Sequence, residues 1–187
     1  VTVINYRLPA IDNVYRLYKP ETPYKSKKRN KEHQAKQLAA VKRKHPDKVL
    51  AYQRFERFIN GALNTTKAFT SYKQLKAAKL GMDALITGSD QVWNTGLTKG
   101  INPAYLLDFG PKEIRRISYA VSRGDKEMSN WDRFYFERRL NAFDFLSVRE
   151  ENVAEEISAM TDKKVVVTAD PTFLVSRKQF DTIRRKY

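Results

Sequence analysis

Three polar side chains stand directly after a short apolar run near the middle of the chain. The run from Asp83 to Thr87 leads through a glycine into Ser89, Asp90 and Gln91, which supply a hydroxyl, a carboxylate and an amide. A short apolar run bounded by turn residues is typical of a buried parallel strand. Ligands of open α/β sheets bind beyond the carboxyl ends of such strands, so a site is expected here. The alternative is an ordinary turn in which Asp90 accepts hydrogen bonds from nearby backbone N–H groups.

Polar residues also follow three later apolar runs, which predict strands over 116–121, 145–148 and 164–168. The carboxyl ends of parallel strands lie along one edge of a sheet, so all four polar groups should converge. Arg149 and the first turn of the helix after it could hold a phosphate, because free N–H groups and the helix dipole favour anions. The alternative for Arg149 is an ion pair with Glu150, Glu151 or Asp170. The polar residues at these three ends are Ser122 and Arg123, Arg149 and Glu150, and Asp170.

The elements that must position these residues alternate between strand and helix from Ser71 onward. This alternation predicts an α/β fold, with a Rossmann-like parallel sheet and helices on both faces, over residues 71–187. A loop over 94–110 is long enough to be functional. Periodicity and capping signals predict the helices of this core at 71–81, from 129 onward, at 150–160 and from 176 onward.

The chain before this core has a different character. Residues 1–6 predict a short strand. Residues 31–44 are good helix formers with few apolar anchors, which predicts either an exposed helix or a mobile arm. A second helix is expected from Pro46 to Gly61, because Pro is favoured at the first helical position. Its apolar residues recur at helical spacing and should dock it on the body; they are Val49, Tyr52, Phe55, Phe58 and Ile59.

Positive charge is concentrated in a basic helical segment at 16–60. The whole chain of 187 residues carries a net charge of +15, and from Arg16 to Arg57 there are 14 Lys and Arg against 4 Asp and Glu. Such a segment can bind an anionic membrane surface, an acidic glycan or nucleic acid. Nucleic acid is the least favoured partner, because stacking aromatics do not alternate with the basic residues. The commoner alternative is a solvated helical face.

Several kinds of site are excluded by composition. The chain has no cysteine, which excludes disulfides and thiolate metal sites and fits a reducing compartment. It contains no Gly-rich phosphate loop and no metal-ligand cluster. His33 and His45, the only two histidines, lie in the basic segment, so no Ser-His-Asp set can form at the strand ends. Acid–base chemistry must then rest on carboxylates or on parts of the protein outside this chain.

No segment predicts membrane insertion or secretion. There is no apolar run of ~18 residues that could span a bilayer, and the first residues lack the basic and apolar regions of a signal peptide. The chain also lacks an initiator Met, opens in a predicted strand and stops in a predicted helix, which indicates a fragment.

Four segments in order resemble the polysaccharide pyruvyl transferase family. They are DALITGSDQVWN at 83–94, ISYAVS at 117–122, LSVREE at 146–151 and ADPTFL at 169–174. Residues 3–7 are also similar to the family's second strand. Four ordered motifs are far more specific than any one of them, and the resemblance covers most of the chain.

The resemblance implies one half of a GT-B-like two-domain architecture. Residues 1–187 would be the N-terminal part of the pyruvyl transferase domain, and the C-terminal half, with further basic and histidine residues for the donor, would be absent. The family transfers a pyruvyl group from phosphoenolpyruvate to a sugar of a cell-surface polysaccharide, forming a ketal. It implies a cytoplasmic enzyme whose partners are phosphoenolpyruvate, as donor substrate, and a carbohydrate acceptor. No cofactor is expected, and nothing in the sequence requires a metal. A fragment of this kind is expected to be inactive alone.

The resemblance also implies roles for the residues at the strand ends. Asp90 would be the base or the partner of the acceptor hydroxyl, and Arg149 would contact the donor anion. Trp93 either stacks on a sugar face or packs in the core, Asp170 holds the turn before Pro171, and the general acid has no candidate. The remaining substrate-binding candidates, which would orient sugar or phosphate oxygens or lie beside those that do, are Ser89, Gln91, Asn94, Ser122 and Glu150.

Two other functions are compatible with the same residues. One is a different glycan-directed group transferase on the same scaffold, because fold and motif do not determine donor or acceptor. The other is a non-catalytic module in which the basic segment binds an acidic glycan, a membrane surface or nucleic acid.

Overall fold

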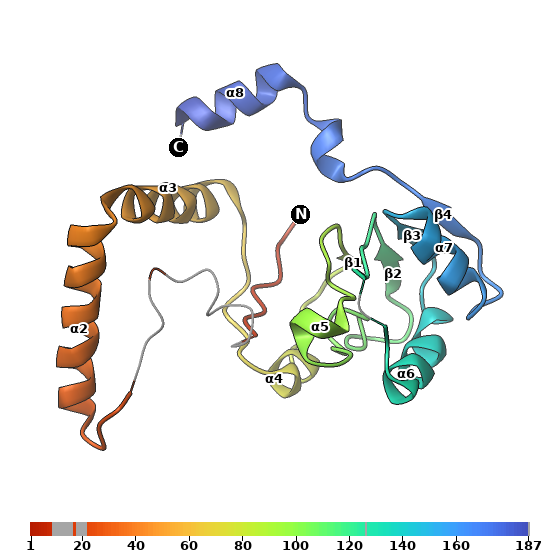
Figure 1. Cartoon of the computed structure of the whole chain (residues 1–187). Coiled ribbons are helices and arrows are strands. Elements are labelled where there is room, and N and C mark those ends of the chain that lie inside the picture. The colour runs from red at the N-terminus through yellow and green to blue at the C-terminus, as the bar shows by residue number, and fades with distance from the viewer. Residues whose placement is uncertain (9–16, 18–21, 126, 187) are drawn as a thin grey trace. The chain divides into compact units, whose positions relative to one another are not determined.

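The computed structural model describes residues 1–8, 17, 22–125 and 127–186. The chain divides into two compact units, Val1–Thr70 with Asp181–Tyr187, and Ser71–Phe180. Figure 1 labels the elements of both units. Among the described residues, no helix is both long and apolar enough to cross a membrane.

The first unit contains the two predicted helices. Helix α2 spans Lys27–Lys44 and begins earlier than predicted, because Ser26 caps it by accepting a hydrogen bond from the backbone N–H of Arg29. Helix α3 spans Pro46–Ala62 and starts at the proline as predicted. Val49 is buried, whereas Phe55 is 54% exposed, so the predicted docking face is only partly used. The start of the predicted basic segment, residues 16 and 18–21, lies outside the described residues.

The prediction of a strand over residues 1–6 is wrong, because this stretch does not form a regular strand. Residues 1–8 form only two isolated parallel bridges, Val3 with Thr65 and Tyr6 with Phe69. Bridges this short do not make a ladder, so this stretch pairs with the chain that follows α3 without becoming a strand of a sheet.

The second unit contains four short parallel strands. They are β1 (Ala84–Thr87), β2 (Arg115–Ser118), β3 (Leu146–Val148) and β4 (Val165–Val167). Strand β1 pairs in parallel with β2, and β3 pairs in parallel with β4. Two single bridges, Ile117 with Phe145 and Val121 with Val148, connect the two ladders. The strands therefore follow one another in chain order with all carboxyl ends on one edge, which confirms the α/β class.

Strand β2 is shorter than predicted for a backbone reason. It ends at Ser118, and Ala120 takes a positive φ of 46°, which breaks the extended conformation. Val121 then returns to bridge Val148. The backbone N–H of Ala120 donates to the Ser147 Oγ at 2.8 Å, which compensates for the lost ladder bond.

The predicted helices after Ser71 begin close to their expected positions, and the last of them crosses the boundary between the two units at Phe180. Ser129 caps α6 through the N–H of Asp132, and Ser176 and Gln179 form a reciprocal capping box. The first helix stops well before the predicted Gly81, and a short helix lies inside the predicted long loop. The bounds are α4 Tyr72–Lys76, α5 Thr95–Thr98, α6 Asn130–Leu140, α7 Glu151–Ser158, the 3-10 helix η1 Pro171–Leu174, and α8 Arg177–Lys186.

The core lies on one side of the β1–β2 ladder. Leu85 is 2% exposed, whereas Ile86, on the opposite face of the same strand, is 66% exposed. The prediction of helices covering both faces is therefore wrong at β1 within the described chain. Trp131 and Phe134 of α6 are also exposed. The largest fully buried side chains are Trp93, Phe136, Phe143, Leu75, Leu106 and Leu140.

The long loop before β2 is held by a buried arginine. The guanidinium of Arg116 donates to five backbone carbonyls, those of Leu107, Phe109, Pro111, Lys112 and Ile114. Burial lowers the pKa of Arg116. Five carbonyl acceptors satisfy the charged group without a carboxylate. The side chain of a β2 residue therefore holds the backbone of the loop in place.

Candidate functional site

The site begins where β1 ends against the segment that follows β2. Gly88 has a φ of +126°, and a Cβ there would stand 2.0 Å from the backbone oxygen of Tyr119. Only glycine permits this approach. The Gly88–Ser89 peptide bond is cis. The close approach places Ser89 and Asp90 beside the ends of the other strands.

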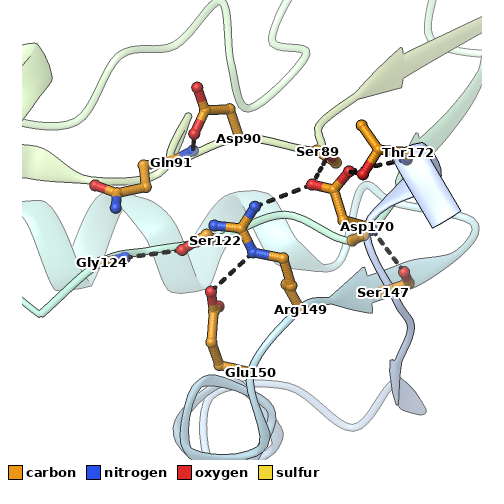
Figure 2. Close-up of polar contacts among 11 residues, drawn as sticks. Ser89, Asp90, Gln91, Ser122, Gly124, Ser147, Arg149, Glu150, Asp170 and Thr172 are labelled. Atoms are coloured by element: carbon orange, nitrogen blue, oxygen red, sulfur yellow. Dashed lines mark hydrogen bonds and ion pairs between the residues drawn. The ribbon is translucent and has the colours of Figure 1, made fainter. Parts of the chain in front are cut away.

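The ends of β1, β3 and β4 meet at the carboxylate of Asp170. Ser89 Oγ donates to Asp170 Oδ2 at 2.8 Å, and Arg149 Nη1 contacts the same oxygen at 3.1 Å. The backbone N–H and the hydroxyl of Thr172 both donate to Asp170 Oδ1. Figure 2 shows this convergence. These hydrogen bonds hold the pKa of Asp170 well below its usual range, and the two from Thr172 have the largest effect. Asp170 thus holds the turn before Pro171, as predicted.

Arg149 is paired with two carboxylates. Its Nε donates to Glu150 Oε1 at 3.1 Å, in addition to the contact with Asp170. The hydrogen bond that Arg149 donates to Glu150 is the main cause of its raised pKa. The ion pair named as one alternative from sequence is therefore present, with Glu150 and Asp170 as partners. These contacts use two of the five guanidinium N–H groups, and the side chain is 30% exposed, so N–H groups remain for a ligand.

Glu150 contributes one further feature. Its Oε1 accepts from Arg149, but its Oε2 is buried and has no hydrogen-bond partner among the described residues. Glu150 is also the N-cap of α7, and its side chain makes no capping hydrogen bond. The first-turn N–H groups of α7 therefore receive no capping hydrogen bond from the Glu150 side chain.

Asp90 has a different environment from Asp170. Its Oδ1 accepts from the backbone N–H of Gln91 at 2.7 Å, and the second oxygen has no partner in the described part of the chain. The residue is exposed. Figure 2 shows its carboxylate directed away from the Arg149–Asp170 pair. The backbone carbonyl of Asp90 accepts from Ser122 N at 3.2 Å, which ties the loop to the end of β2.

Gln91 and Asn94 form a second polar pair. Asn94 Nδ2 donates to Gln91 Oε1 at 2.8 Å, and Asn94 Oδ1 caps α5 through the N–H of Gly96. Gly124 packs against this pair, because a Cβ at that position would lie 2.3 Å from Asn94 Nδ2. The Gln91 amide nitrogen has no partner among the described residues, so Gln91 keeps donors for a ligand while Asn94 is engaged in the loop.

Ser122 and Trp93 are both buried beside the Asp90 loop. Each is 2% exposed. Ser122 Oγ accepts from Gly124 N, and its carbonyl accepts from Trp93 N. Trp93 donates through Nε1 to the carbonyl of Tyr105 and packs edge-to-face on Phe136. Of the two roles open for Trp93, the structure shows the core role. Through their backbone hydrogen bonds, Ser122 and Trp93 hold the loop that carries Asp90.

Sequence reasoning missed a group of buried hydroxyls beneath these strand ends. Ser147 Oγ is hydrogen-bonded to Thr168 Oγ1, and Ser118 Oγ donates to the carbonyl of Ser147. Ser118 and Ser147 are fully buried. A serine between two apolar residues of a three-residue strand was the available signal, because a mid-strand hydroxyl in a core needs a partner. Arg123 was noted only as a strand-end residue, and it pairs with Glu156 of α7 at 2.6 Å.

The described residues contain no group of three His, Asp or Glu side chains arranged to hold a metal ion. At this edge the described residues place one exposed carboxylate, two paired carboxylates, one paired guanidinium, and the amide and hydroxyl groups between them.

The sequence matches a known protein family. The family model described as polysaccharide pyruvyl transferase matches residues 2–187, which is nearly the whole chain. No curated protein and no solved structure gives a significant match.

Proposed function

Because this chain belongs to the polysaccharide pyruvyl transferase family, we propose that the protein transfers a pyruvyl group from phosphoenolpyruvate to a sugar of a cell-surface polysaccharide. Family membership indicates a transferase that modifies glycans. The proposal adds the donor and the product, a cyclic ketal across two sugar hydroxyls.

The proposed reaction sets three chemical requirements. Two acceptor hydroxyls form C–O bonds to C2 of the donor, and the C2–O bond to phosphate breaks. The two acceptor hydroxyls lose two protons. One is balanced by the proton that the enol methylene gains on becoming a methyl group, and the other leaves with phosphate. A base must therefore stand at the attacking hydroxyl, an acid at the methylene, and cationic or N–H groups at the carboxylate and phosphate.

Asp90 is the proposed base. A catalytic base must be within hydrogen-bond reach of the hydroxyl proton, and Asp90 has an exposed carboxylate with one oxygen not engaged by the described residues. Gln91 beside it has amide donors to orient a sugar oxygen. The observation that carries the proposal is the exposed carboxylate of Asp90, which accepts a single hydrogen bond and lies at the carboxyl edge of the parallel strands.

Arg149 is the proposed contact for the donor anion. It has guanidinium N–H groups beyond those used by Glu150 and Asp170, and it precedes a helix whose N-cap side chain makes no capping hydrogen bond. The group of Arg149, Glu150 and Asp170 carries one positive and two negative charges, which alone would repel a donor of several negative charges. We propose that a second, GT-B-like half supplies the balancing cations and the general acid.

The test uses the full-length protein, phosphoenolpyruvate and a panel of glycan acceptors. Phosphate release and acceptor mass are followed together, with pyruvate replacing phosphoenolpyruvate as the control donor. We expect phosphate release that depends on the acceptor, with a mass gain of one pyruvate less one water. Absence of turnover together with absence of phosphoenolpyruvate binding by calorimetry would contradict the donor assignment.

A further inference from the structure

Helix α2 carries a large positive charge that the proposed reaction does not use. Its 18 residues contain eight Lys and Arg and a single acidic residue, Glu32, and none of its residues is buried. All eight cations are exposed. No ion pair to any of them is formed by the part of the chain that the structure describes.

The charge lies mainly on one side of the helix. The half-buried residues of α2 recur at spacings of three and four, which places them on one side at 3.6 residues per turn; they include Asn30, Gln34, Gln37 and Val41. Six of the eight cations fall on the opposite side. These six form the outer basic face, which consists of Lys28, Arg29, Lys31, Lys36, Lys42 and Arg43.

We propose that the outer basic face of α2 lies along a membrane surface rich in anionic lipid headgroups. A straight helix of 18 residues is about 27 Å long, so a one-sided row of cations suits a flat, extended layer of negative charge. The face has no aromatic residue to stack on bases or sugar rings. It also has no large apolar residue to insert, so the contact is electrostatic adsorption to headgroups.

The expected strength follows from the number of cations. Each Lys or Arg close to an anionic surface strengthens partitioning by roughly fivefold, and the effect decays within a Debye length of about 8 Å at physiological salt. Replacing three cations of the face should therefore weaken partitioning on the order of 100-fold. Raising the salt concentration should abolish it.

The decisive variant replaces Lys28, Arg29 and Lys31 by Gln. These residues lie at the N-terminal end of α2, where positive side chains are unfavourable to the helix dipole. Gln is a good helix former, so the substitutions should leave the helix intact or strengthen it. If these cations bind the membrane, the variant should lose binding and keep its helix content. If they support the helix instead, the variant should lose helix content.

The experiment measures sedimentation of the full chain with vesicles of phosphatidylcholine alone or with a third of phosphatidylglycerol. We expect binding only to the anionic vesicles, an approximately 100-fold loss in the triple variant, and unchanged or increased helicity by circular dichroism. The matched control replaces three exposed lysines elsewhere, Lys79, Lys112 and Lys164, by Gln. It removes the same charge and should retain binding within about threefold.

Three outcomes would overturn the proposal. The first is no preference of the wild-type chain for anionic vesicles. The second is an equal loss in the control variant, which would indicate net charge rather than this face. The third is tighter binding to duplex DNA or to a soluble polyuronate than to vesicles at the same concentration of negative charge. If the triple variant loses helix, Lys42→Gln with Arg43→Gln tests the other end of the face by the same criteria. The assay needs neither donor nor acceptor, so its result is independent of the proposed reaction.

Discussion

Asp90 and Asp170 both follow parallel strands of the second unit, and their surroundings are opposite. The carboxylate of Asp170 accepts four hydrogen bonds, from Ser89, Arg149 and twice from Thr172. That of Asp90 accepts one, from the next residue in the chain. A carboxylate with both oxygens occupied holds structure together, whereas one with a vacant, exposed oxygen can still accept a proton from a substrate.

The difference indicates a structural role for Asp170 and supports the proposed catalytic role of Asp90. Asp170 joins the ends of β1, β3 and β4, and the ionised state that its low pKa favours suits an anchor. Asp90 is positioned through its backbone, because its carbonyl accepts from Ser122 N while its side chain stays exposed. Substitution of Asp90 should therefore affect turnover, and substitution of Asp170 should affect folding.

The largest expected effect is that of Asp90→Asn on turnover. Asn has the same shape but cannot take a proton, and loss of a general base typically lowers the rate ~10²- to 10⁴-fold. The Gln91 N–H can still donate to the Asn oxygen, so we expect the free energy of unfolding to change by less than about 0.5 kcal/mol. The measurements are kcat in the full-length protein and urea unfolding.

The matched control for Asp90→Asn is Asp162→Asn, an exposed aspartate in the turn before β4. It should change neither turnover nor stability. Retention of wild-type kcat by Asp90→Asn would remove Asp90 from the mechanism and end the contrast between the two aspartates.

A second prediction concerns the contact that places Ser89 between Asp90 and Asp170. Gly88→Ala would put a Cβ 2.0 Å from the backbone oxygen of Tyr119, and backbone cannot yield as a flexible side chain can. We expect a loss of about 2–4 kcal/mol in the free energy of unfolding, measured by urea denaturation.

Gly81→Ala provides the control for the Gly88 prediction. Gly81 also has a positive φ, of 57°, but nothing lies within 4 Å of its ideal Cβ. Only the left-handed conformation is then disfavoured, at about 1–2 kcal/mol. Equal losses in the two variants would show that backbone conformation, and not the approach to Tyr119, makes Gly88 necessary.

The sequence was sufficient to predict the four strands of the second unit, most helix starts and the convergence of polar residues at one edge. These depend on local signals, such as apolar runs followed by turn residues and the serine caps of α6 and α8. The contrast between Asp90 and Asp170 was not predictable in the same way. One donor to Asp170, Ser89, lies 81 residues away in the sequence, and no local pattern encodes such a partner.

Burial was the other feature that local patterns missed. Ser122 and Trp93 carry polar groups that could contact a ligand, yet both are buried next to the Asp90 loop. In β1, Ile86 continues the apolar run but faces the uncovered side. The positive φ of Ala120 has no residue signature either, because only the surrounding contacts impose it. Which face of an element is covered is decided by tertiary packing.

The smallest and most specific prediction concerns Asp170 and pH. The folded-state pKa of Asp170 lies below its unfolded value of about 4. The stability that its ionised form contributes is therefore present above pH ~4 and is lost as the pH falls towards the folded-state pKa. Asp170→Asn keeps an acceptor for Thr172 but loses the charge that Arg149 contacts. Its urea midpoint should lie below that of the wild type at pH 7, and the gap should narrow below pH ~4. If the difference in urea midpoint stayed constant from pH 7 to pH 3, the charge of Asp170 would not contribute to stability. The two aspartates would then differ in packing rather than in charge.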